Sequence, residues 1–176
     1  MKPSLSKSWR LTIPAMKFDI DKADFANPNH CSGIVDVLNS YATDEIGRGN
    51  PLSEDVRKRL VSELSNHPAA FVLLAFVDSQ AVGIAICFMG FSTFQARPLL
   101  NIHDLAVLPE FRGLGIGRAL LNTVEAYAIE RGCCKLTLEV REDNRRAFGL
   151  YERFGFGDFV AGNSTVRTRF LSKSIH

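Results

Sequence analysis

The chain has 176 residues, 46% of them hydrophobic and 23% charged, which are the proportions of an ordinary globular protein and exclude a disordered or fibrous one. That length suits a single domain over residues 1–176, and a net charge of +2 is too small to predict a nucleic-acid partner. The longest apolar stretch, residues 81–91, is too short to span a bilayer, and residues 1–10 lack the apolar core of a signal peptide. We therefore expect a cytoplasmic protein with no membrane partner.

The cysteines show no C-x-x-C pair, and no histidine lies close enough to Cys133 and Cys134 to suggest a zinc module. The cysteines are Cys31, Cys87, Cys133 and Cys134. This pattern predicts free thiols in a reducing compartment and no metal site.

The first half of the chain predicts two helices and a hairpin. In chain order, we expect a strand at 16–20, helices at 30–46 and 53–67, strands at 71–77 and 81–88, and a loop at 91–98. The helices follow from apolar residues at helical spacing, and Ser53 has the character of an N-cap. The two apolar strands flank the turn Asp78-Ser79-Gln80, which is typical of an antiparallel hairpin.

The second half alternates more regularly. We expect a strand at 99–108, a helix from the glycines at 113–117 to Gly132, a strand at 135–140, a helix capped by Asp143 or Asn144 and closed by Gly155, and strands at 156–160 and 165–171. This order mixes hairpins with crossovers, which predicts an α/β (α+β) fold with a mixed, mostly antiparallel central sheet and helices on both faces. The central hairpin argues against a doubly wound dinucleotide fold.

The glycine-rich segment after the strand at 99–108 predicts an anion site. Three glycines at 113, 115 and 117 allow a tight turn and a close backbone approach, and the following helix N-terminus favours a negative ligand. Arg112 and Arg118 add charge-assisted hydrogen bonds. We expect a ligand with a phosphate or pyrophosphate, although the glycines are also compatible with a simple tight turn.

Two nucleotide-binding alternatives fit this loop less well. Its G-x-G-x-G spacing departs from the G-x-G-x-x-G of dinucleotide enzymes, although Glu139 stands in the next strand, where those enzymes carry a ribose-binding acid. No Gly-Lys-Ser/Thr follows, so a P-loop is excluded.

Residues 112–117 read RGLGIG, and residues 143–156 read DNRRAFGLYERFGF. They resemble the R/Q-x-x-G-x-G/A loop and the N-x-x-A-x-x-x-Y-x-x-x-G-F segment of the GNAT superfamily of N-acetyltransferases. The resemblance is strong from Asn101 to Phe156 and rests on element order before it. It implies a GNAT-like single domain with a motif-bearing core at 99–160 and an acceptor-binding half at about 16–98.

The resemblance also implies acetyl-CoA as the acetyl donor, with no metal, and a set of cofactor-binding residues. In the family, the strand before the loop splays from its neighbour, and its backbone groups receive the pantetheine arm and polarise the thioester carbonyl. The corresponding residues here are Leu105, Ala106, Val107, Arg112, Gly113, Leu114, Gly115, Ile116, Gly117, Arg118, Asn144, Ala147 and Tyr151.

Tyr151 stands where the family protonates the departing thiolate, which makes it the candidate general acid. Without the motif, it would be interpreted as a core tyrosine on the inner face of a helix. Asn144 is expected to bond the pantetheine or a water, to cap the helix, or to do both.

An attacking ammonium must first lose a proton, so a base is expected near the thioester. His103 and Asp104 are the candidates, and strand alternation predicts that only one of them faces the substrate. Residues 91–94 and 102–104 also resemble the spermidine/spermine and thialysine N-acetyltransferases, which carry glutamate in place of His103. A lone strand histidine is equally compatible with a structural role.

The sequence therefore predicts an enzyme that transfers acetyl to a primary amine by direct attack in a ternary complex. The acceptor is expected to be a small-molecule or peptide amine, and the family's habit suggests a homodimer. The alternative is a non-catalytic acyl-CoA-binding or sensing module, which could dispense with Tyr151 and a base.

Overall fold

The computed structural model describes residues 16–47 and 49–157. Its elements are β1 (Asp19–Lys22), α1 (Pro28–Thr43), α2 (Glu54–Asn66), β2 (Ala70–Val77), β3 (Gln80–Ser92), β4 (Arg97–Val107), the 3-10 helix η1 (Pro109–Phe111), α3 (Ile116–Glu130), β5 (Leu136–Leu138) and α4 (Arg145–Phe154). The strands form one sheet in the order β1-β2-β3-β4-β5, antiparallel except for the parallel pair of β4 and β5. The predicted mixed, mostly antiparallel sheet is confirmed.

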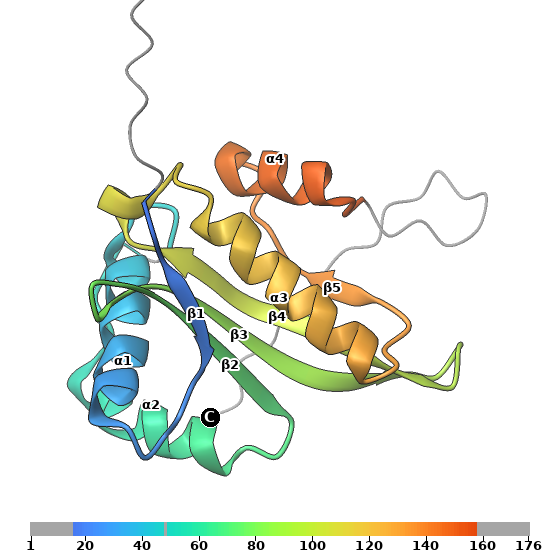
Figure 1. The fold of residues 1–176 in the computed structure, drawn as a ribbon, viewed down its shortest axis with the longest axis horizontal. Helices are drawn as coiled ribbons and strands as arrows, with labels where there is room; N and C mark the ends of the chain where they lie inside the picture. The colour runs from blue at the N-terminus through green and yellow to red at the C-terminus, as the bar shows by residue number, and fades with distance from the viewer. Residues whose placement is uncertain (1–15, 48, 158–176) are drawn as a thin grey trace, which may run out of the picture.

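Helices cover both faces of the sheet, as Figure 1 shows: α1 and α2 lie on one side, and α3 and α4 on the other. Because side chains alternate along a strand, β2 contributes Leu73 to the α3 side and Leu74 to the α1 side. Leu73 belongs to the core that contains Leu120 of α3, whereas Leu74 belongs to the core that contains Ile34 of α1. The sheet therefore separates two apolar cores.

Local capping confirms several of the predicted boundaries. The Ser53 hydroxyl accepts a hydrogen bond from the Val56 N–H at 3.3 Å and starts α2. The Asn144 side chain accepts one from the Ala147 N–H at 3.1 Å and starts α4, which Gly155 closes in the left-handed conformation at φ 101°. These short-range rules need only a few neighbouring residues, so the sequence predicts them well.

Other boundaries differ from the prediction. The expected loop at 91–98 shortens to a turn at 93–96, because Phe91 pairs with Pro98 and Ser92 with Arg97 and extends β3 and β4. The strand expected at 135–140 shortens to Leu136–Leu138. The strand predicted at 165–171 lies outside the described residues, as does most of the one at 156–160. No helix in the described part of the chain is long and apolar enough to cross a membrane.

The end of β4 is where the sheet opens. β4 pairs with β5 only at Leu100, Asn101 and Ile102, although it continues to Val107 alongside β3. Beyond Leu138 the chain leaves the sheet and leads into α4. Among the described residues, no strand therefore pairs with the outer edge of β4 from residue 103 to 107. This is the splay that the sequence resemblance implied.

Candidate functional site

The open edge of β4 forms one wall of a cleft of about 740 Å³. The other walls come from the end of α1 and the turn after it, from the glycine loop before α3, and from α4. Every predicted cofactor-binding residue except Leu114, which is exposed, lines this cleft. The fold thus brings the two sequence motifs to one place.

Backbone groups of β4 point into the cleft. The Leu108 N–H donates to the Val82 carbonyl at 2.8 Å, so alternate residues of β4 direct their backbone groups toward β3. Leu105 and Val107 then direct theirs toward the open edge. The Val107 carbonyl accepts a hydrogen bond from Arg112 Nε at 2.9 Å, which agrees with this orientation. The backbone of Leu105 and the N–H of Val107 are the groups that face the cleft.

The glycine loop has the geometry of an anion cradle. Gly113 and Gly115 adopt left-handed φ angles of 81° and 89°, which residues with a side chain rarely adopt. No side chain caps α3, whose N-cap is Gly115. Helix N-termini leave backbone N–H groups without helical partners, and here they border the cleft. The loop therefore fits a phosphate or pyrophosphate group.

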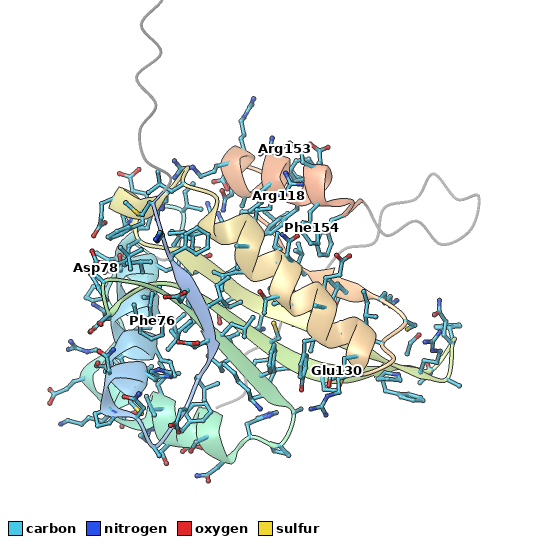
Figure 2. All side chains as sticks on the ribbon, viewed as in Figure 1. Phe76, Asp78, Arg118, Glu130, Arg153 and Phe154 are labelled. Carbon is cyan, nitrogen blue, oxygen red and sulfur yellow. The ribbon has the colours of Figure 1, made fainter. Side chains whose placement is uncertain are left out.

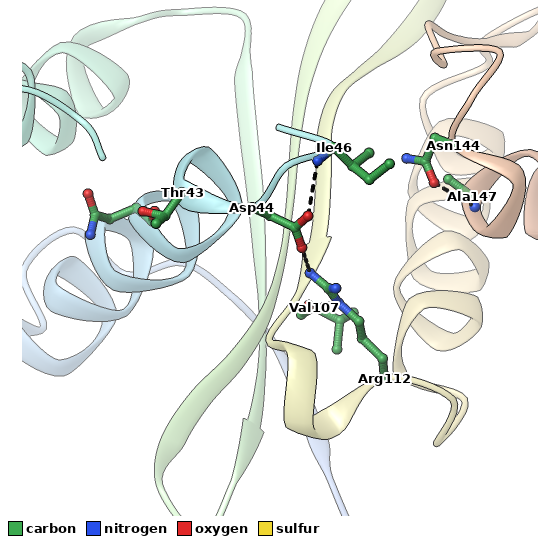
Figure 3. Close-up of polar contacts among 8 residues, drawn as sticks. Thr43, Asp44, Ile46, Val107, Arg112, Asn144 and Ala147 are labelled. Carbon is green, nitrogen blue, oxygen red and sulfur yellow. Dashed lines mark hydrogen bonds and ion pairs between the residues drawn. The ribbon is translucent and has the colours of Figure 1, made fainter. Parts of the chain in front are cut away.

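Arg112 has a second role that the sequence did not reveal. Its Nη2 forms an ion pair with Asp44 Oδ2 at 2.7 Å, drawn in Figure 3, and only about a quarter of either side chain is exposed. The hydrogen bond from Arg112, with smaller help from the Ile46 N–H, holds the pKa of Asp44 below its usual value. Asp44 therefore neutralises the charge that the sequence assigned to phosphate binding.

Other arginines supply positive charge at the cleft. Arg118 and three arginines of α4, Arg145, Arg146 and Arg153, line it, and Figure 2 labels Arg118 and Arg153. Their guanidinium groups make no ion pair or hydrogen bond with other described residues. Arg145 and Arg146 occupy the first turn of α4, where the helix dipole disfavours cations. Sequence analysis missed the α4 arginines. Two arginines directly after a helix N-cap are unfavourable for the helix, and this could have indicated a binding role.

Tyr151 lies at the inner wall of the cleft. Its side chain is 8% exposed, and its ring meets that of Phe156 edge-on at 5.8 Å. Burial raises the pKa of Tyr151 to about 12, with contributions from nearby Tyr41 and Asp104. The phenol is therefore protonated at neutral pH and is able to donate a proton. Tyr151 therefore packs into the core on the α3 side of the sheet and also lines the cleft.

His103 and Asp104 lie on the same face of the sheet, so the expectation that alternation separates them is wrong. Asp104 pairs with Ile86, whereas Ile102 pairs with Cys87, which makes His103 an extra residue in β4. The exposed His103 ring meets Phe88 edge-on at 5.5 Å, and both Phe88 and Ile86 belong to the core beside α1. Neither His103 nor Asp104 lines the cleft.

The cysteines carry no sign of catalysis. All four are free, and burial raises the pKa of Cys87 to about 12, so its thiol is protonated at neutral pH. Within the part of the chain that the structure describes, no cluster of histidine, cysteine and acidic residues is arranged to hold a metal ion.

Comparison with known proteins places these features in context. The model of the acetyltransferase (GNAT) family matches residues 34–156, more than two thirds of the chain. Among solved structures, a ribosomal-protein-alanine N-acetyltransferase from Brucella melitensis is 23% identical with a TM-score of 0.65, covering 88% of this chain and 100% of its own.

An aminoglycoside 6′-N-acetyltransferase from Acinetobacter baumannii is 21% identical with a TM-score of 0.68, covering 91% of this chain and 100% of its own. An aminoglycoside N-acetyltransferase solved with CoA is 18% identical with a TM-score of 0.68, covering 89% and 95%. At these identities, the three structures show a shared fold.

Proposed function

The chain belongs to the acetyltransferase (GNAT) family, and from this premise we propose that it transfers an acetyl group from acetyl-CoA to a primary amine. The observation that carries the proposal is one cleft in which an open strand edge, a glycine loop at a helix N-terminus and a buried tyrosine meet. Acetyl-CoA, when bound, supplies the activated acetyl group as a thioester. The acceptor is a small-molecule or peptide amine.

The residues around the cleft divide the binding of acetyl-CoA among them. The loop at 113–117 and the first turn of α3 receive the pyrophosphate, and Arg118 adds charge. The outward backbone groups of Leu105 and Val107 receive the pantetheine arm. Asn144 uses its carbonyl oxygen to cap α4, which leaves its amide NH₂ directed to the ligand or a water.

The proton transfers need an acid and a base. Burial raises the pKa of Tyr151 to about 12, so the phenol is protonated at neutral pH, and Tyr151 donates this proton from Oη to the leaving sulfur. We place the acceptor on the α1 side of the sheet, where the β4 bulge brings His103 and Asp104 together. One of the two takes or relays the amine proton, and the amine attacks directly in a ternary complex.

Three further features belong to the proposal. Residues 16–98 build the acceptor half and 99–160 the motif-bearing core. The protein works in the cytoplasm, where acetyl-CoA is available and the free thiols are stable. A homodimer is the expected assembly.

A panel of amines, incubated with acetyl-CoA and monitored by release of free thiol, tests the proposed activity. The panel includes a diamine, an aminoglycoside, a diamino acid and a peptide with a free N-terminus. A reaction without any amine measures the hydrolysis of acetyl-CoA, which is subtracted. Amine-dependent thiol release supports the enzyme. Tight binding of acetyl-CoA without release for any amine would instead favour the acyl-CoA sensing module.

The proposed base is tested separately with His103→Gln and Asp104→Asn. If one of them takes the amine proton, the acid limb of the pH profile of kcat/KM moves or disappears in that variant, for amines of different basicity. A limb that follows the basicity of the amine in both variants would mean that the amine loses its proton to water.

A further inference from the structure

One ion pair in the cleft is not explained by phosphate binding. Arg112 is in the position where the motif predicts a pyrophosphate contact, yet its guanidinium is held by two partners within the protein. Nη2 meets Asp44 Oδ2 at 2.7 Å, and Nε donates to the Val107 carbonyl at 2.9 Å. Two of the five N–H donors of the guanidinium, one on Nε and one on Nη2, are therefore in use, and these two contacts fix the guanidinium in one orientation.

Asp44 is held as firmly as its partner. Its Oδ1 accepts the Ile46 N–H at 3.1 Å, so the two carboxylate oxygens bind different elements. Its own N–H donates to the carbonyls of Ser40 and Tyr41 and ends α1, and its carbonyl accepts the Gly47 N–H at 2.8 Å. A side chain at Gly47 would collide with the Tyr41 carbonyl, because its Cβ would lie only 2.0 Å away. The turn after α1 is thus tightly defined.

These contacts join two walls of the cleft that are distant in sequence. The turn at 44–47 carries Ile46, which lines the cleft from the α1 side, and Arg112 opens the glycine loop on the opposite side. Figure 3 shows the Asp44 carboxylate between the end of α1 and the Arg112 side chain next to β4. The hydrogen bond from Arg112 lowers the pKa of Asp44, which favours the ionised carboxylate in this pair.

We propose that Asp44 is a positioning residue, which holds Arg112 as a strut between the turn after α1 and the end of β4. Through this strut, one contact fixes both the glycine loop that receives the CoA pyrophosphate and the acceptor-side wall. Arg112 then contributes geometry rather than free positive charge, and the remaining arginines of the cleft supply the charge. The inference rests on the proposed use of acetyl-CoA.

A purely electrostatic model and the strut predict opposite changes in coenzyme A affinity for the same substitution. Removing an acidic group beside an anion site strengthens the attraction of the site for a polyanion. On that basis alone, Asp44→Asn would bind coenzyme A more tightly. If Asp44 positions the loop, the same variant binds it more weakly, by about tenfold, because a hydrogen bond to a charged group is lost.

Calorimetric titration of the full chain with coenzyme A measures whether the affinity rises or falls. We compare wild type, Asp44→Asn, Arg112→Lys and the matched control Glu110→Gln, which removes an exposed acid two residues from Arg112. Arg112→Lys keeps the positive charge but loses the planar guanidinium. The strut therefore predicts weaker coenzyme A binding in this variant, whereas a model based on charge alone predicts unchanged binding. Glu110→Gln is expected to bind equally or slightly more tightly. Thermal melts identify any variant that fails to fold.

Steady-state kinetics add a readout that simple destabilisation would not give. Asp44→Asn should raise KM for both acetyl-CoA and the amine, while kcat stays within about twofold because Tyr151 is untouched. Equal or tighter coenzyme A binding in both Asp44→Asn and Arg112→Lys overturns the strut. If wild type itself does not bind coenzyme A, the proposed function fails instead, so the two failures are distinguishable.

Discussion

The proposed cofactor wall of the cleft and the proposed acceptor side offer different kinds of groups to a ligand. The cofactor wall uses backbone groups: the outer edge of β4, left-handed glycines and the N-terminus of α3. The proposed acceptor side uses side chains from the end of α1, which line the cleft, and from the bulge in β4, whose residues do not line it. Backbone recognition leaves a mark in the sequence, because it demands glycine at fixed spacing. Side-chain recognition tolerates many residue types and leaves none.

The largest expected effect concerns Tyr151, the proposed general acid. Tyr151→Phe keeps the ring and its packing but removes the proton, so kcat should fall by about 10²–10⁴-fold with little change in coenzyme A affinity. Since the pKa of Tyr151 is about 12, activity in wild type should show no loss from tyrosine ionisation below about pH 11. A kcat within twofold of wild type, with chemistry limiting, would leave Tyr151 a core residue.

The next effect tests whether the cofactor wall depends on its backbone. Gly115→Val forces a β-branched residue into a left-handed conformation, and we expect coenzyme A binding to weaken by about 10- to 100-fold. The matched control is Gly49→Val, which imposes the same strain at φ 69° in a loop outside the cleft. Both variants should lose stability, but only the first should lose affinity in calorimetry. Equal coenzyme A affinities in the two variants would contradict recognition by the backbone of the glycine loop.

A smaller effect concerns charge on the cofactor wall. The double variant Arg145→Ala with Arg146→Ala removes two exposed cations at the start of α4, so we expect acetyl-CoA KM to rise about three- to tenfold. The same change relieves an unfavourable interaction with the helix dipole and should raise the free energy of unfolding by a few tenths of a kcal/mol.

Opposite changes in affinity and stability would show that these arginines serve binding rather than folding. Arg57→Ala, an exposed arginine of α2 remote from the cleft, is the control and should alter neither quantity. The rise in KM should also shrink at high salt, because added ions screen exposed charges.

The smallest expected effect concerns the contribution of the Asp44–Arg112 ion pair to stability. The pKa of Asp44 is lowered in the folded protein, chiefly by its hydrogen bond with Arg112, so the pair stabilises the fold above the unfolded pKa and is lost as the pH falls through the folded one. Wild type should therefore lose more unfolding free energy than Asp44→Asn, by about 1 kcal/mol or less, when the pH drops below about 4. Urea unfolding at pH 6 and pH 3 measures the difference, with exposed Asp36→Asn as control. Equal losses would indicate that the pair contributes nothing to stability.

Most of the fold could be predicted from the sequence because local rules decide it. Ser53, Asn144 and Gly155 set helix ends through bonds to residues no more than four positions away. Helical spacing of apolar residues identified α1, α2 and α3, and a short apolar run before a turn identified β2. The strands whose bounds were wrong are β1, which was expected at 16–20 and lies at Asp19–Lys22, and β3, β4 and β5. Their ends depend on a partner strand rather than on their own side chains.

The sequence by itself determined the cofactor wall: a glycine loop at a helix start, a tyrosine on the inner face of α4, and a family shared with acetyltransferases. Only the tertiary structure decided what the side chains around it do. Asp44 and Arg112 are 68 positions apart, and no local sequence pattern predicts their contact. The bulge at His103 likewise arises from pairing with β3, so alternation within β4 could not reveal it. Long-range pairing depends on how whole elements pack, which is information that no short window of sequence contains.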